Sequence, residues 1–156
     1  MSIKNKYIIS YCLKNDKNYP EKRKKYGLLS PEEAFITPID SPFTQNVISS
    51  ELIHFNDICL LAPVEPTKII GIGLNYLDHA IEFGKYPPKE PLIFLKALST
   101  LANPQDSIIL PSYSKRVDYE AELVIIIKKT TKNISEKDAK HYILGYTCGN
   151  DITARD

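Results

Sequence analysis

Short apolar runs, separated by proline-rich and polar turns, dominate the hydrophobic pattern of this chain. Runs of this length that are rich in β-branched residues are typical of strands. The first predicts a strand at residues 7–13. Five more follow, at residues 68–72, 92–96, 108–110, 117–127 and 142–150. The pattern therefore predicts an α+β fold that is mostly β.

Helical signals are few. Residues 76–83 are predicted to be helical and are followed by Gly84, a residue type that commonly ends helices. A second helix is expected at residues 135–141, where Ser135 and Asp138 form an approximate capping box. The Ser-Pro-Glu-Glu stretch at residues 30–33 predicts a third, short helix, because it combines a cap with a proline at the first helical position.

The length of 156 residues allows one hydrophobic core and a small second lobe. Residues 14–25 are basic and polar, and they predict a solvated hairpin or loop. Residues 62–66 contain two prolines and predict an extended linker. We therefore expect a small N-terminal β lobe at residues 1–62 and a second domain at residues 63–156.

Charge and cysteine content argue against several classes of protein. The chain has 20 Lys and Arg against 19 Asp and Glu, and its one basic cluster, at residues 22–25, stands alone, so we expect no nucleic-acid partner. No apolar run approaches the length of a membrane span or a signal peptide. The three cysteines are odd in number and lack CxxC spacing. These features predict a cytoplasmic protein without a membrane partner.

Three acids, Asp118, Glu120 and Glu122, alternate at the start of the apolar run at residues 123–127. Alternate residues of a strand share one face, and like charges side by side repel. A hard divalent cation would hold them together, because Mg²⁺, Mn²⁺ and Ca²⁺ prefer carboxylate oxygens. The alternative is a solvated strand end whose acids meet water or lysine.

Glycines at positions 71 and 73 suggest a dinucleotide-binding turn, but Tyr76 occupies the third glycine position and no long helix follows. We therefore reject that interpretation. His79 and Glu82 lie three apart on a predicted helix, so the carboxylate could orient the imidazole as a general base. A surface ion pair is the alternative for this pair.

Three more residues are candidates for binding. Lys96 ends an apolar run and could present a cation to an anionic substrate, although it could equally mark a strand end. Asp151 follows a predicted strand and could complete an oxygen ligand set, or it could belong to a turn. Arg155 could offer its planar fork to a carboxylate, or form a surface salt bridge.

Taken together, these blocks resemble the fumarylacetoacetate hydrolase family, in particular its bacterial 2-hydroxyhepta-2,4-diene-1,7-dioate isomerase and acylpyruvate hydrolase-like members. The resemblance is carried in order by residues 61–76, 78–82, 94–96, 118–123, 145–146 and 150–156. It implies a mixed β-roll with a small N-terminal β lobe. Complete members of the family are expected to be homodimers.

The resemblance also implies a chemistry. Glu120, Glu122 and Asp151 match the ligands of Mg²⁺ or Mn²⁺, with Ca²⁺ as a further candidate. His79 and Glu82 match an acid/base dyad on a short helix that closes over the substrate. The substrates are small 2-oxo or enol acids, and C–C hydrolysis, decarboxylation and isomerisation all pass through a metal-stabilised enolate.

The resemblance further implies a stretch beyond residue 156 that supplies a catalytic lysine and the closing strands. The chain is therefore expected to be a C-terminally truncated fragment, to obtain the remainder from a partner chain, or to be a degenerate homologue. The alternative to an enzyme is a non-catalytic product that binds a metal or a partner chain.

Overall fold

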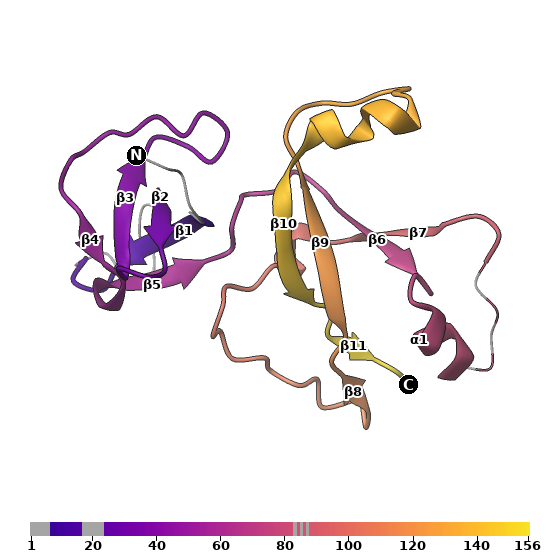
Figure 1. Ribbon diagram of the computed structural model, residues 1–156. Helices are drawn as coiled ribbons and strands as arrows, with labels where there is room; N and C mark the ends of the chain where they lie inside the picture. The colour runs from indigo at the N-terminus through magenta and orange to yellow at the C-terminus, as the bar shows by residue number, and fades with distance from the viewer. Residues whose placement is uncertain (1–6, 17–23, 83, 85, 87) are drawn as a thin grey trace. The chain divides into compact units, whose positions relative to one another are not determined.

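The computed structural model describes residues 7–16, 24–82, 84, 86 and 88–156, and the chain divides into two compact units, Met1–Asp106 and Ser107–Asp156 (Figure 1). Strands dominate the described part of both units, and the helical segments are short. The expectation of a mostly β fold is confirmed. The lobe boundary expected after residue 62 stays a prediction.

A five-stranded antiparallel sheet with the order β4-β3-β2-β1-β5 opens the first unit. Its strands are β1 (Tyr7–Leu13), β2 (Lys25–Ser30), β3 (Phe35–Ile39), β4 (Ile53–His54) and β5 (Ile58–Leu61), with the 3₁₀ turn η1 (Phe55–Asp57) before β5. Tyr11, Ile36 and Ile58 form the buried core of this sheet. Burial raises the pKa of the Tyr11 hydroxyl. Full burial of such side chains stabilises the fold by about 1.5–3 kcal/mol each.

The prediction of a short helix at residues 30–33 is wrong. β2 continues to Ser30 and β3 begins at Phe35, so these residues form the turn of a hairpin, and Ala34 takes a φ of 55°. Strand pairing places Leu29 opposite Ile36, which is completely buried. A capping signal is worth only about 1 kcal/mol, less than the pairing and burial that the hairpin provides.

The loop expected at residues 14–25 falls largely on residues 17–23, which lie outside the described residues. Its first residues form a turn in which the Asp16 amide donates to the Leu13 carbonyl at 3.3 Å.

A two-stranded antiparallel sheet formed by β6 (Ile69–Gly73) and β7 (Leu92–Lys96) follows in the same unit. The helix α1 (Leu77–Glu82) comes after β6, and the 3₁₀ turn η2 (Leu98–Thr100) comes after β7. Gly84 takes a φ of 63°, as expected of a glycine just beyond a helix end. Both predicted strands and the helix are confirmed, with ends shifted by a residue or so.

The second unit contains two strand pairs. β9 (Ala121–Ile127) pairs with β10 (Ile143–Asn150), and β8 (Val117–Asp118) pairs with β11 (Thr153–Ala154), all antiparallel. The segment expected to be helical at residues 135–141 is the 3₁₀ helix η3 (Glu136–Tyr142), and the Ser135 hydroxyl donates to the Asp138 carboxylate there.

Two strand predictions in this unit are wrong. Residues 117–127 form two strands instead of one, because β8 pairs with β11 whereas β9 pairs with β10, and the chain changes partner at Tyr119 and Glu120. Residues 108–110 form no strand and are exposed. This run is only three residues long and is followed directly by Pro111, which lacks an amide for strand pairing.

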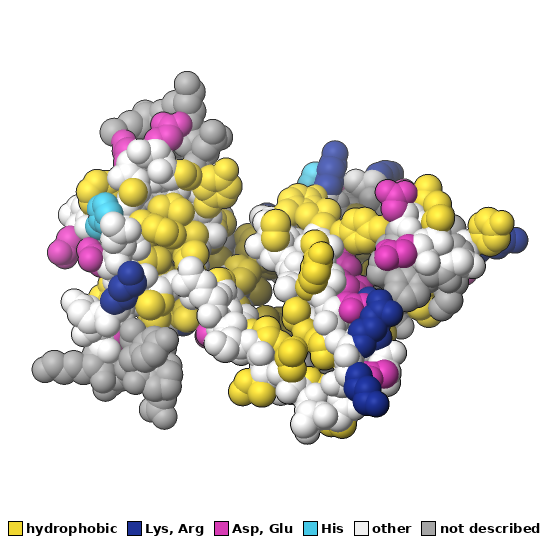
Figure 2. All heavy atoms as spheres, turned by 90° about the horizontal axis from the view of Figure 1, so that it is seen from below, with side chains coloured by type: hydrophobic (Ala, Val, Ile, Leu, Met, Phe, Trp, Pro, Cys, Tyr) yellow, Lys and Arg dark blue, Asp and Glu magenta, His cyan; other side chains and the backbone are white. Residues whose placement is uncertain are grey.

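The β9–β10 pair exposes apolar side chains. Leu123, Ile125 and Ile127 alternate with Val124 along β9, and all four are exposed, as is Tyr146 on β10. Because alternate residues point to opposite faces, both faces of this pair carry exposed apolar side chains. Figure 2 shows hydrophobic side chains at the molecular surface. In the described part of the chain, no helix is long and apolar enough to cross a membrane.

Candidate functional site

The acidic residues lie where the β9–β10 pair ends. The pairing of the two strands ends at Ala121, the first residue of β9, which lies opposite Asn150, the final residue of β10. One step further, the Asp151 amide donates to the Glu120 carbonyl at 2.8 Å, and the Glu120 amide donates to the Asn150 side-chain oxygen at 3.1 Å. The backbones of Glu120 and Asp151 are therefore held together, although the two residues are distant in sequence.

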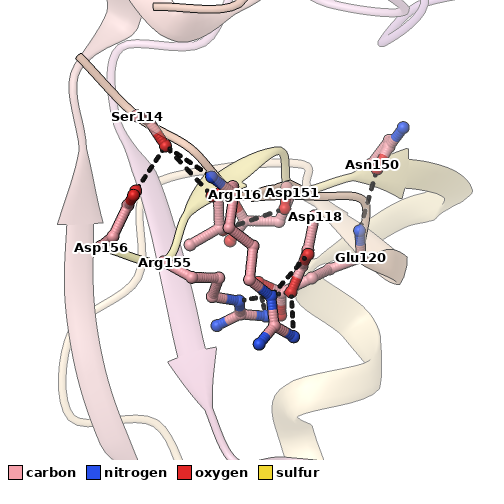
Figure 3. Close-up of polar contacts among 9 residues, drawn as sticks. Ser114, Arg116, Asp118, Glu120, Asn150, Asp151, Arg155 and Asp156 are labelled. Carbon is pink, nitrogen blue, oxygen red and sulfur yellow. Dashed lines mark hydrogen bonds and ion pairs between the residues drawn. The ribbon is translucent and has the colours of Figure 1, made fainter.

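Arg155, just after β11, connects two of the acids (Figure 3). Its Nη2 donates to Glu120 Oε1 at 2.8 Å, and its Nε donates to Asp118 Oδ2 at 3.1 Å. The side chains of Arg155 and Glu120 are only 22% and 19% exposed, so water screens this pair less than it would a surface ion pair.

Asp118 is bound by a second arginine. Arg116 donates from Nε to Asp118 Oδ1 at 3.2 Å and from Nη2 to Oδ2 at 2.9 Å, which is the forked geometry of an arginine–carboxylate pair. The hydrogen bonds from Arg116 and then Arg155 hold the pKa of Asp118 below its ordinary value. Asp118 is thus a partner of the arginines. The spacing of the acids had grouped it with Glu120 and Glu122, whereas the family resemblance left it out of the ligand set.

The shared face expected for Asp118, Glu120 and Glu122 does not follow from the observed strands. That argument required one continuous strand, and β8 ends at Asp118 while β9 begins at Ala121. Asp118 pairs with Thr153 on β11, whereas Glu122 pairs with Gly149 on β10.

Glu120, Glu122 and Asp151 nevertheless suit a hard cation in their chemistry. All three are half-buried carboxylates at neighbouring positions of one strand pair, and carboxylate oxygens are the donors that Mg²⁺ and Mn²⁺ prefer. Among the described residues, no group of three or more His, Cys, Asp or Glu side chains is close enough together to hold a metal. The ligand set therefore stays a prediction.

His79, Glu82 and Lys96 lie in the other unit. His79 and Glu82 belong to α1, and Glu82 is exposed. The side chain of His79 lies outside the part of the chain that is described, so the dyad stays a prediction. Lys96 is the last residue of β7, is half-buried and pairs with Ile69. The role of Lys96 in substrate binding also stays a prediction.

The sequence did not predict several residues that form hydrogen bonds with the acidic residues Glu120 and Asp156. The Asn150 side-chain oxygen accepts a hydrogen bond from the Glu120 amide, whereas the sequence suggested only that the next residue, Asp151, could belong to a turn. The Ser114 hydroxyl donates to Asp156 Oδ1 at 2.5 Å, and the Lys115 amide donates to Asp156 Oδ2 at 2.8 Å. The Ser114 contact is the main reason that the pKa of Asp156 is lowered. No local pattern marks Ser114, because its partner is distant in sequence.

Comparison with known proteins agrees with this architecture. The family described as fumarylacetoacetate (FAA) hydrolase C-terminal matches residues 68–156. A fumarylacetoacetate hydrolase domain-containing protein 2 homolog from Dictyostelium discoideum is 43% identical over 149 residues, which is 96% of this chain and 48% of that protein. The chain belongs to the fumarylacetoacetate hydrolase family.

Two further relatives bear on the reaction. The mitochondrial oxaloacetate tautomerase fahd2 of Xenopus laevis is 46% identical over 69% of this chain and 34% of that protein. The structure of 5-carboxymethyl-2-hydroxymuconate delta-isomerase from Mycobacterium smegmatis superposes with a TM-score of 0.79 at 29% identity, over 97% of this chain and 56% of that one. The chain spans about half the length of the Dictyostelium relative.

Proposed function

We propose that this chain contributes the acidic part of a divalent-metal site that acts on a small 2-oxo or enol acid. The observation that carries the proposal is the hydrogen bond from the Asp151 amide to the Glu120 carbonyl, because it holds together the backbones of two acidic residues that are distant in sequence. Glu122 follows two residues along β9. Mg²⁺ or Mn²⁺ is the expected cofactor, with Ca²⁺ as a further candidate.

Each candidate residue has a role in this proposal. Glu120, Glu122 and Asp151 would hold the cation, which when bound supplies a Lewis acid that polarises the 2-oxo carbonyl. His79 would move a proton at the carbon next to that carbonyl, and Glu82 would orient its imidazole. Lys96 would present a positive charge to the substrate carboxylate.

Among the three reactions considered, we favour keto–enol isomerisation over C–C hydrolysis and decarboxylation. The support is that one relative is named an oxaloacetate tautomerase and one structural neighbour is named an isomerase. An isomerisation needs a proton to leave one atom and return at another, which a single imidazole and its carboxylate partner can perform.

The test is a keto–enol assay with oxaloacetate, followed by ultraviolet absorbance of the enol, with Mg²⁺ or Mn²⁺ present and then removed by a chelator. In a complete enzyme, His79→Ala should slow turnover by about a hundredfold or more if His79 moves the proton. His141→Ala is the matched control, because His141 is exposed on η3, and it should leave the rate unchanged. Metal-independent turnover, or equal rates for the two variants, would contradict the proposal.

The exposed apolar side chains of β9 and β10 favour a second candidate, a non-catalytic chain that binds a partner polypeptide. A second copy of the chain is the first partner to test, because a homodimer is expected for complete family members. Sedimentation velocity should then detect a dimer, and Ile125→Glu should weaken it. A monomer at every concentration would exclude the homodimer.

We also propose a cytoplasmic location, on the basis of three cysteines without CxxC spacing. The Xenopus relative is named as mitochondrial, so the compartment needs a direct measurement. Fractionation of cells expressing a tagged chain would give it, and recovery in an organelle would contradict the proposal.

A further inference from the structure

We propose that Cys12 and Cys59 are a redox-reactive pair, in which hydrogen peroxide converts the two thiols into a reversible disulfide between β1 and β5. The pair lies in the first unit and is independent of the acidic residues proposed to bind a metal. Disulfides of cytosolic proteins are usually transient, and many of them sense redox conditions, so such a pair is compatible with the proposed cytoplasmic location.

Strand pairing places the two cysteines directly opposite each other. β1 and β5 are antiparallel neighbours in the five-stranded sheet, and their register sets Cys12 against Cys59 (Figure 1). Directly opposite residues of an antiparallel pair project from the same face of the sheet. The Cys12 thiol donates to the Cys59 carbonyl with a sulfur–oxygen distance of 3.9 Å, so the Cys12 sulfur already lies against the residue with which it is proposed to react.

The spacing of the two backbones at this position suits a disulfide. The Lys14 amide donates to the Asp57 carbonyl at 2.9 Å, two positions further along the same register. Hydrogen-bonded pairs alternate with non-hydrogen-bonded pairs, so Cys12 and Cys59 are also a hydrogen-bonded pair, for which the Cα atoms are about 5.5 Å apart. Disulfides span Cα distances of roughly 4.4–6.8 Å, so the strands need not slide or separate to form one.

The positions of the Cβ atoms make such a bond reversible. The Cβ atoms of directly opposite residues are about 4.5–5.5 Å apart, whereas a disulfide brings them to roughly 3.5–4.5 Å. The strands must therefore approach each other at Cys12 and Cys59 when the bond forms. A disulfide held under strain is reduced more easily than a relaxed one.

Burial sets the order of the chemical steps. Cys59 is half-buried, whereas the side chain of Cys12 is only 1% exposed, so Cys59 meets the oxidant first. The Cys59 sulfur attacks hydrogen peroxide, the O–O bond breaks, and Cys59 becomes a sulfenic acid as one water leaves. The Cys12 sulfur then attacks the Cys59 sulfur. The S–S bond forms, the S–O bond breaks, and the hydroxyl leaves with the Cys12 proton as a second water. The two thiols together lose two electrons, which reduce the peroxide to water.

The bond fastens one edge of the sheet. β5 is an edge strand, whereas β1 pairs with β2 on one side and β5 on the other. Edge strands open locally more readily than central ones, and a cross-link to β1 opposes that opening. The backbone amides of β5 should therefore exchange with deuterium more slowly in the oxidised chain than in the reduced chain.

The test treats the purified, reduced chain with hydrogen peroxide and follows the product by intact mass spectrometry. The chain should lose the mass of two hydrogen atoms, and peptide mapping should link Cys12 to Cys59. Reduced glutathione should reopen the bond without denaturant, because strained disulfides are the labile ones. Hydrogen–deuterium exchange of the reduced and oxidised chains measures the effect on β5.

Three variants serve as controls, and circular dichroism checks that each of them folds. Cys148→Ser is the matched control, because Cys148 is exposed and lies opposite Leu123, and this variant should still lose two hydrogen atoms. Cys59→Ser should not form the bond. Cys12→Ser should accumulate a sulfenic acid at Cys59, which dimedone traps.

Three outcomes would each contradict the proposal. A link between Cys12 and Cys59 that is missing, or that appears only in urea, would mean that the folded strand pair does not bring the two sulfurs together. A link that glutathione cannot reopen would be a structural disulfide. Equal exchange of the β5 amides in the two forms would mean that the bond does not fasten the edge strand.

Discussion

The Asp151 amide donates to the Glu120 carbonyl at 2.8 Å, and this bond extends the β9–β10 pairing past its last ladder position. Asn150 adds a second contact to the same glutamate, because its side-chain oxygen accepts a hydrogen bond from the Glu120 amide. The backbone of Glu120 is thus held by two consecutive residues, Asn150 and Asp151, and one of them contributes a side chain that is not acidic.

Replacement of Asn150 by alanine should therefore weaken the site. Loss of the hydrogen bond to the Glu120 amide should cost about 0.5–1.5 kcal/mol of stability. The affinity for Mn²⁺ should fall by about tenfold, because the ligand loses its orientation. Calorimetric titration measures the affinity, and Asn56→Ala, at an exposed position of η1, is the control. Unchanged Mn²⁺ affinity in Asn150→Ala would remove Asn150 from the site.

The close approach of Gly27 to Ile36 makes a second prediction. A Cβ atom at position 27 would lie 2.2 Å from Ile36 Cγ2, and Ile36 is completely buried. Gly27→Ala should therefore lower the free energy of unfolding by about 1–3 kcal/mol, as overpacking does. Urea unfolding followed by circular dichroism gives the value. Gly145→Ala is the control, because a Cβ there would meet no atom within 4 Å. Equal stability of the two variants would contradict the packing argument.

Ser10 offers a change that should stabilise the protein. Its hydroxyl is buried, and it has no hydrogen-bond partner among the residues that are described. Ser10→Ala should raise the free energy of unfolding by about 1 kcal/mol, because an unsatisfied buried hydroxyl is costly. Ser114→Ala should have the opposite effect, since it removes the bond to Asp156. A loss of stability in Ser10→Ala would indicate that the hydroxyl has a partner.

The loop after β3 should respond to acid through Asp40. The pKa of Asp40 lies below its ordinary value, chiefly because the Thr44 hydroxyl donates to the carboxylate, with further bonds from Asn46 and Ser41. The folded loop therefore binds the proton more weakly than the unfolded chain. Its stabilising contribution is complete above about pH 4 and is lost as the pH falls through the lowered pKa.

An NMR titration of the Asp40 carboxyl carbon measures this effect. Thr44→Val should raise the pKa of Asp40 toward its ordinary value, because it removes the main donor. Thr100→Val is the control, since the Thr100 hydroxyl donates to the Ala97 carbonyl instead. If Thr44→Val leaves the pKa of Asp40 in place, the hydroxyl is not the cause of the shift.

The sequence by itself determined the local elements and the family. The apolar runs at residues 7–13, 92–96 and 142–150 are strands to within a residue at their ends, because short runs rich in β-branched and aromatic residues favour strands locally. The ordered blocks also identified the family, which the comparisons confirm. These features depend on residues that are neighbours in the chain.

Only the tertiary structure decided which segments pair and what each polar group contacts. The hairpin at residues 30–33 replaced a predicted helix because Leu29 meets Ile36 across the sheet. The run at residues 117–127 split because β8 and β9 have different partners. Arg155 became the partner of Asp118 and Glu120 because β11 lies beside β8. Contacts between distant residues depend on strand pairing, and local sequence does not encode them.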